Sequence, residues 1–84
     1  ITDLIYVHVD LDVLDPVDIP GAGLPVENGP TADELGEALE LMFEYPSVKG
    51  FGLASYPWRR DKERKGLDSV RRLVDGVITG VKNR

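Results

Sequence analysis

The sequence contains no cysteine, and this and other absences exclude several kinds of protein. Without cysteine, no disulfide bond and no Cys-based metal site can form. No apolar run approaches the roughly 18 residues that a membrane span needs, and no basic-then-apolar signal peptide opens the chain. These absences predict that the protein has no membrane partner and that it is cytoplasmic.

The chain is also short and lacks an initiating Met. Its 84 residues leave room for one small domain or for a piece of a larger one. A chain of this length buries only about 60% of its unfolded surface, so its core is marginal without a cross-link. The sequence begins at Ile1, inside an apolar run. We therefore expect residues 1–84 to be a fragment of a domain.

Positive charge is missing from the first half of the chain. Residues 1–48 contain eleven acids and no Lys or Arg, whereas residues 49–84 contain all ten bases and four acids. The acidic half would repel a phosphate backbone, which argues against a nucleic-acid partner. The basic stretch at 59–65 is broken by Asp61 and Glu63 and follows Trp58, a pattern more typical of a solvated loop than of a nucleic-acid patch.

The pattern predicts a strand, a long loop, a helix, a second strand and a second helix. In the first strand, 4–12, alternation places Ile5, Val7, Val9 and Leu11 on one face and Tyr6, His8, Asp10 and Asp12 on the other, with Tyr6 expected in the core. Four prolines and three glycines between residues 15 and 30 mark the loop, and loops of this length are usually functional.

Both helices show clear signals. Thr31 and Glu34 fit a capping box at the start of the first helix, and Pro46 ends it. Its expected buried residues are Leu35, Ala38, Leu39 and Met42. The second strand is expected at 48–55, and the last helix, about 67–82, carries an apolar stripe at positions 70, 73, 74, 77, 78 and 81. Strands separated by a helix predict an α/β fold, a βαβα unit with a parallel sheet.

The candidate chemistry lies where the first strand ends. Asp10 and Asp12 share a face at the carboxyl end of a strand, where ligands bind in open α/β sheets. Two neighbouring carboxylates repel each other unless a proton or a cation intervenes, and Mg²⁺ or Mn²⁺ prefers such oxygen ligands. His8, on the same face, is a candidate ligand or orienting residue, although a lone His is more often structural. The alternative is a solvated strand end that enters an Asp15–Pro16 turn.

The run from His8 to Pro16, followed by Pro20-Gly21-Ala22-Gly23-Leu24-Pro25, resembles the carboxy-terminal motif of the ureohydrolases. This family, which includes arginase, agmatinase and formimidoylglutamase, has the pattern Ser-x-Asp-x-Asp-x-x-Asp-Pro and then Pro-Gly-x-Gly-Thr-Pro. The match continues through the strand and helix that follow. The resemblance identifies residues 1–84 as the carboxy-terminal part of an arginase-like domain.

The resemblance implies a three-layer α/β/α hydrolase with a parallel sheet and two Mn²⁺ ions at the strand ends. A hydroxide that bridges the ions would attack a small guanidino or amidino substrate and break a linear C–N bond. By the same resemblance, Asp10 would bridge both ions, Asp12 would chelate one, and Asp15 would be a structural turn residue. The other family ligands precede this segment, so the fragment alone is expected to be inactive. Family members are commonly homo-oligomers.

Three positions depart from the family pattern. His8 replaces the first Ser of the motif, next to the metal ligands, and Leu24 replaces the Thr of Gly-Thr-Pro, which removes a hydroxyl beside the substrate. Ala54 stands where the family has a Glu that pairs with the guanidinium of the substrate. Loss of a buried charge partner typically costs a few kcal/mol of binding.

Two other function classes remain open. Ala54 also suits a catalytically diverged ureohydrolase-like domain that is kept for assembly. The apolar strand that runs into Asp10 and Asp12 also resembles the first motif of haloacid-dehalogenase-type phosphatases, in which Asp10 would be the nucleophile and Mg²⁺ the cofactor. The Pro/Gly-rich loop after Pro16 fits that family badly, and no later acidic metal motif appears.

Overall fold

The computed structural model describes residues 4–84; Ile1, at which the first apolar run begins, lies outside the described residues. Two strands and two α-helices alternate along the chain, and a single turn of 3-10 helix follows the first strand. Their bounds are β1 (Ile5–Asp10), η1 (Leu11–Val13), α1 (Ala32–Phe43), β2 (Val48–Ala54) and α2 (Lys65–Asn83). The predicted βαβα order is therefore confirmed.

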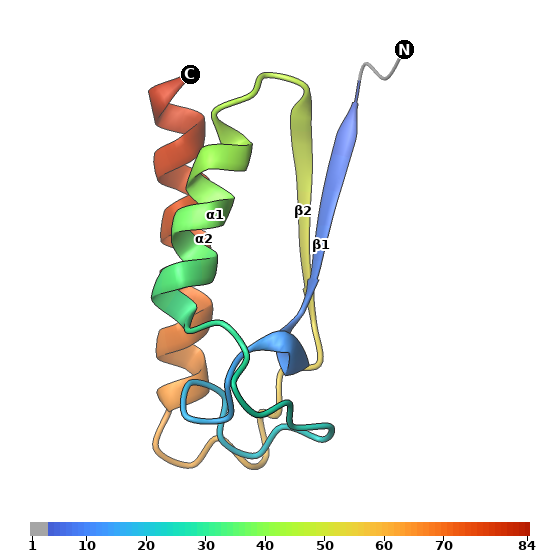
Figure 1. Ribbon diagram of the computed structural model, residues 1–84, viewed down its shortest axis with the longest axis vertical. Helices are drawn as coiled ribbons and strands as arrows, with labels where there is room; N and C mark the ends of the chain where they lie inside the picture. The colour runs from blue at the N-terminus through green and yellow to red at the C-terminus, as the bar shows by residue number, and fades with distance from the viewer. Residues whose placement is uncertain (1–3) are drawn as a thin grey trace.

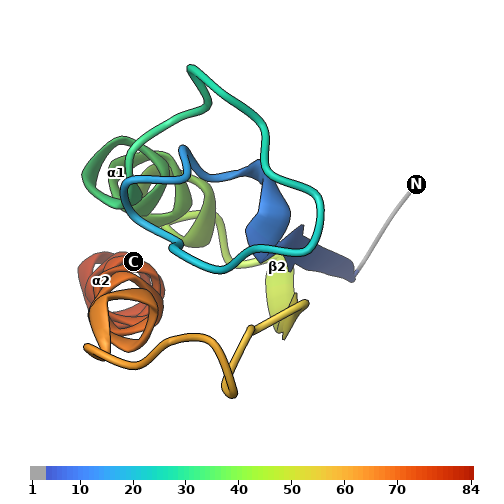
Figure 2. The same cartoon turned by 90° about the horizontal axis from the view of Figure 1, so that it is seen from below.

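The two strands are parallel, so their carboxyl ends lie at one edge of the sheet. Asp10, the last residue of β1, is the register partner of Ala54, the last residue of β2. Both helices cover the same face of the sheet (Figure 1), and the view from below shows them side by side (Figure 2). The loops at 14–31 and 55–64 gather beyond the carboxyl ends of the strands, where ligands of such sheets bind (Figure 1).

Strand β1 confirms the predicted alternation only in its middle. Val9 is buried and Val7 packs against the core, on the face that the helices cover. The prediction of Tyr6 as a core residue is wrong, because its side chain is 61% exposed. Alternation turns Tyr6 away from the core face, and a Cβ on Gly50 or Gly52 of the neighbouring strand would collide with its ring. The ring therefore lies over the glycine backbone of β2.

Helix α1 starts as the sequence predicts. The Thr31 hydroxyl accepts a hydrogen bond from the Glu34 N–H (3.0 Å), and the Glu34 carboxylate accepts one from the Thr31 N–H (2.9 Å). Its buried face differs from the predicted one, since Ala38 and Met42 are exposed. The buried residues of the helix are Ala32, Gly36, Leu39 and Phe43. The helix turns this face both toward the sheet and toward α2, a tertiary arrangement that periodicity alone does not specify.

Helix α2 packs on α1 through glycine, and the predicted apolar stripe is confirmed only in part, since Leu73 is buried and Val70 and Val77 pack against the core. Its buried residues are Gly66, Ser69, Leu73, Gly76 and Gly80, whereas Ile78 and Val81 of the stripe are exposed. A Cβ on Gly76 would overlap the carbonyl oxygen of Gly36 in α1. The backbones of the two helices are therefore in direct contact at this point. Neither helix of residues 4–84 has the combined length and apolar character needed to cross a bilayer.

Hydrogen bonds join α2 to other parts of the chain near both of its ends. The Ser69 hydroxyl donates to the Asp18 carbonyl oxygen in the 14–31 loop, at 2.6 Å. At the other end, the Arg84 guanidinium donates to the carbonyl oxygens of Tyr45 (2.9 Å) and Val48 (2.8 Å). The position of α2 along its axis is thus linked both to that loop and to the connection between α1 and β2.

Asp61 caps the start of α2 from the preceding loop. Its carboxylate is only 4% exposed and accepts hydrogen bonds from the N–H groups of Gly66 (2.7 Å) and Leu67 (2.9 Å) and from the Tyr56 hydroxyl. Burial opposes ionisation, but these three hydrogen bonds outweigh it and hold the pKa of Asp61 below its ordinary value. The shared hydrogen bond also raises the pKa of Tyr56. Sequence analysis had placed Asp61 in a solvated loop, and only the fold reveals this role.

The first prediction concerns the glycine contact between the helices. Gly76→Ala should lower the free energy of unfolding by about 1–2 kcal/mol, because overpacking against a backbone carbonyl exceeds the gain of about 1 kcal/mol in helix propensity. Urea unfolding followed by circular dichroism measures the change. Gly23→Ala is the control, since a Cβ there meets no atom within 4 Å. Equal or greater stability of Gly76→Ala would contradict the close contact.

The second prediction concerns the acid sensitivity of the Asp61 cap. A carboxyl whose pKa is lowered by folding stabilises the folded state above its ordinary pKa, near 3.8, and loses this effect as the pH falls through the lower folded-state value. Asp61→Asn should therefore cost about 1–3 kcal/mol at pH 7, and the difference from wild type should shrink below about pH 3.8. Urea unfolding of both proteins across pH 2–7 tests this prediction, with a substitution of an exposed residue, Glu63→Gln, as control. A difference in the free energy of unfolding that does not vary with pH would contradict it.

Candidate metal centre

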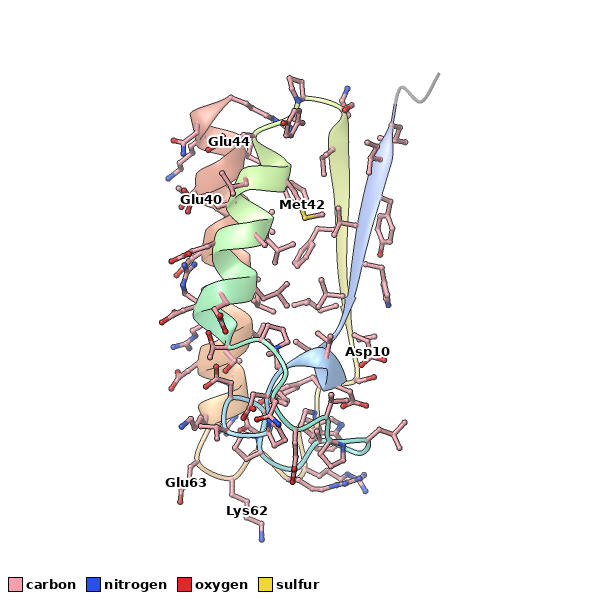
Figure 3. All side chains as sticks on the ribbon, in the orientation of Figure 1. Asp10, Glu40, Met42, Glu44, Lys62 and Glu63 are labelled. Carbon is pink, nitrogen blue, oxygen red and sulfur yellow. The ribbon has the colours of Figure 1, made fainter. Side chains whose placement is uncertain are left out.

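Asp10 ends β1 and directs the chain into the turn that follows. Its Oδ1 accepts a hydrogen bond from the Asp12 N–H at 3.0 Å and so caps the 3-10 helix η1. This backbone hydrogen bond, followed by one from the Ser55 hydroxyl, holds the pKa of Asp10 below its ordinary value. The side chain is exposed. Asp10 is therefore a carboxylate at neutral pH, exposed where β1 meets the turn (Figure 3).

Asp12 lies in η1 and not in the strand, where the sequence placed it. Its side chain is half-buried, and its Oδ1 is buried without a hydrogen-bond partner among the described residues. A buried carboxylate oxygen without a partner is costly, and a bound cation is one of the few groups that would satisfy it. The pair of carboxylates in this turn therefore fits a hard divalent cation, which takes oxygen ligands.

His8 shares the exposed face of β1 with Asp10 but is held by a different contact. Its ring stacks on that of Tyr6, with 6.3 Å between the ring centroids and 25° between the planes. In residues 4–84, no group of three or more His, Asp or Glu side chains is placed to hold a metal ion. His8 therefore does not complete a three-ligand site with Asp10 and Asp12, and these residues supply at most two protein ligands.

Ala54 faces Asp10 across the parallel pair, as its register partner. The structure thus places the position with the most consequential departure from the ureohydrolase pattern directly beside the first candidate ligand. Ser55, which follows, has a left-handed backbone with φ 69°, an uncommon conformation for a residue with a side chain. Sequence analysis missed Ser55, because nothing in its local pattern signals either this backbone or its hydrogen bond to Asp10.

The remaining candidates, Asp15 and Leu24, lie in the 14–31 loop. The Asp15 carboxylate binds two backbone groups: Oδ1 accepts from the Val17 N–H (3.0 Å) and Oδ2 from the Asn28 N–H (3.1 Å). Leu24 is 76% exposed and is not among the side chains packed against the core.

An apolar groove of about 400 Å³ runs beside β1 and reaches Asp10. It is lined by Val7, His8, Val9, Asp10, Val13, Leu35, Leu39 and Met42. Met42 extends from α1 toward the strands, and Asp10 lies at the junction of β1 with the turn (Figure 3). Asp10 is thus the one acidic residue in the lining of a mostly apolar groove.

Known proteins resemble this chain in both sequence and fold. The sequence model of the arginase family matches residues 1–68, which is most of the chain. The chain belongs to the arginase family. The arginase of Bacillus caldovelox is 46% identical over 43 residues, a stretch that covers 51% of this chain and 14% of that protein. The resemblance drawn from the Asp10–Pro16 motif is therefore confirmed.

Solved structures support the arginase-like fold. Formimidoylglutamase from Bacillus subtilis superposes with a TM-score of 0.88 at 28% identity over 95% of this chain, and arginase from the same organism with a TM-score of 0.78 at 28% identity over 89%. The chain spans only 25% and 26% of those two proteins. The predicted fold class is thus confirmed for an α/β segment that corresponds to about a quarter of an arginase-family protein.

Proposed function

We propose that residues 1–84 form the carboxy-terminal part of an arginase-like domain and contribute Asp10 and Asp12 to a centre of two Mn²⁺ ions. The enzyme would hydrolyse a linear C–N bond in a small guanidino or amidino compound. The observation that carries this proposal is the turn itself, which holds two carboxylates at the carboxyl end of β1 and leaves the buried Asp12 Oδ1 without a partner. A cytoplasmic homo-oligomer is part of the same proposal.

The two carboxylates would have different roles because the chain holds them differently. One Asp10 oxygen is engaged by the Asp12 N–H, and Asp10 would help to hold both ions. Asp12 would chelate one ion through the oxygen that has no other partner. When bound, the ions would activate a water molecule and stabilise the charge that develops on the substrate. The lowered pKa of Asp10 keeps this ligand ionised without a proton to displace.

At residue 54 the family pattern has a Glu that pairs with the substrate, and this chain has no charged side chain there. The methyl group of Ala54, opposite Asp10, offers no partner to a guanidinium cation. A positively charged substrate would therefore need its counter-charge from a residue outside 1–84, and a neutral substrate would need none.

Ala54 also supports a second candidate function. An arginase-family domain that has lost its substrate carboxylate can retain fold and metal ligands while serving only in assembly. A phosphatase is not proposed, since the family match provides no support for one.

The third prediction concerns metal content. In a complete arginase-like domain that carries this chain, we expect two Mn²⁺ per chain by elemental analysis. Asp10→Asn should reduce this below one, because Asp10 would touch both ions, and Asp12→Asn should remove about one. Asp75→Asn, on the exposed side of α2, is the charge-matched control. Absence of specific Mn²⁺ binding by the unaltered protein would contradict the proposal.

The fourth prediction tests whether the missing carboxylate at residue 54 limits activity on a guanidino substrate. In the same complete protein, Ala54→Glu should raise kcat/KM for a guanidino substrate at least about tenfold, since a buried charge pair usually contributes more than the 1.4 kcal/mol this requires. Ala54→Gln, of equal length but uncharged, should have little effect. Urea release provides the assay. Equal rates for Ala and Glu at residue 54 would mean that the counter-charge comes from elsewhere.

A further inference from the structure

Asp15 joins two parts of the chain that are thirteen residues apart. Its carboxylate binds the Val17 N–H on its own side of the 14–31 loop and the Asn28 N–H on the returning side. Its own N–H donates to the carbonyl oxygen of Pro30 at 3.0 Å. Two hydrogen bonds of one residue, with Asn28 and Pro30, therefore close the loop at its base.

The returning side of the loop lies directly against the turn that carries Asp12. A Cβ on Gly29 would overlap the Val13 carbonyl oxygen and would lie 3.1 Å from the Asp15 nitrogen. Only glycine allows two backbones to approach this closely without displacement. Gly29 and Asp15 thus form one clamp, which presses the segment 28–30 onto the end of η1.

The clamp and the Asp10 carboxylate fix the turn from opposite sides. Asp10 binds the Asp12 N–H at the start of η1, whereas the clamp holds the residues that follow Val13. Leu14, between them, is fully buried, and its N–H donates to the Leu11 carbonyl oxygen at 3.2 Å. The direction of the Asp12 side chain depends on this turn.

We propose that Asp15 is a positioning residue, which acts with Gly29 to hold the Asp12 turn in the geometry that a metal ion requires. The inference rests on the proposed function, because it takes Asp12 as a metal ligand. Removal of an outer partner that orients a ligand typically costs 10- to 100-fold in metal affinity.

Asp18 provides a matched comparison within the same loop. Its carboxylate also accepts a backbone N–H, that of Ala32 at 2.6 Å, but this hydrogen bond caps α1 and does not touch the Asp12 turn. Asp15→Asn and Asp18→Asn remove the same charge from the same loop. Gly29→Ala disturbs the clamp without removing any charge. The three variants therefore distinguish the effect of the clamp on the position of the Asp12 turn from the effect of removing a negative charge from the loop.

The first experiment measures the clamp without metal, by amide hydrogen exchange of the metal-free complete domain that carries this chain. Protection of the Asp12 and Leu14 amides should fall about fivefold in Asp15→Asn and Gly29→Ala and stay unchanged in Asp18→Asn. The Leu73 amide, in the buried face of α2, should keep its protection in all three. Unchanged protection at Asp12 in both clamp variants, or equal loss at Leu73, would overturn the proposal.

The second experiment measures the ligand, with Mn²⁺ alone as the probe. In a complete arginase-like domain that carries this chain, Mn²⁺ titration should show specific binding, and the apparent Kd should rise about tenfold in Asp15→Asn and Gly29→Ala. Equal weakening in Asp15→Asn and Asp18→Asn, with none in Gly29→Ala, would reduce the effect to charge and overturn the positioning role. Absence of specific Mn²⁺ binding by the unaltered domain would instead overturn the metal site, while the exchange experiment would still decide on the clamp.

Discussion

The hydrogen bond from the Asp12 N–H to the Asp10 carboxylate determines how the end of the first strand forms the candidate metal centre. It stops β1 at Asp10, starts a turn of 3-10 helix and brings the second carboxylate out of the strand. An uninterrupted strand would have placed the two side chains on one face at a spacing fixed by the backbone. The turn instead lets each carboxylate point in its own direction, with one oxygen of Asp10 already used. The loop that follows, with its clamp and its buried Leu14, depends on the chain leaving the strand at this point.

The electrostatics of this end of the molecule favour a cation over an anion. Two carboxylates lie close together in the half of the chain that contains no Lys or Arg. The pKa of Asp10 is lowered mainly by a backbone amide and a hydroxyl, and to a lesser extent by the nearby His8. Hydrogen-bond donors of this kind keep a carboxylate ionised without cancelling its charge. The site therefore retains negative charge that a divalent ion would neutralise.

Signals carried by neighbouring residues in the sequence were sufficient for much of the fold. The capping box at Thr31 and Glu34, the proline-rich loop and the Asp10–Pro16 motif each depend on residues within a few positions, and the structure has the elements they predict. Tyr6 was misplaced because it was expected to be buried near the start of the strand, although alternation puts it on the face of His8 and Asp10, away from the core. The glycine face of α2 was missed because glycine carries no hydrophobic signal, although it allows the closest backbone contact. The hydrogen bonds of Asp15 and Asp61 could not be predicted either, since their partners are set by how the loops fold back.

The backbone contact between the two helices also bears on how the chain tolerates variation. Where side chains pack, a smaller side chain on one helix can be compensated by a larger one on the other. Gly76 and Gly36 have no side chains, so no such compensation is possible at their contact. A larger residue at either position would require α2 to move away from α1 as a rigid body. Such a movement would pull the Ser69 hydroxyl away from Asp18 in the 14–31 loop. That loop folds back onto the Asp12 turn. Substitutions in the helix pair, remote from the carboxylates in sequence, would thus be mechanically coupled to the metal end of the molecule.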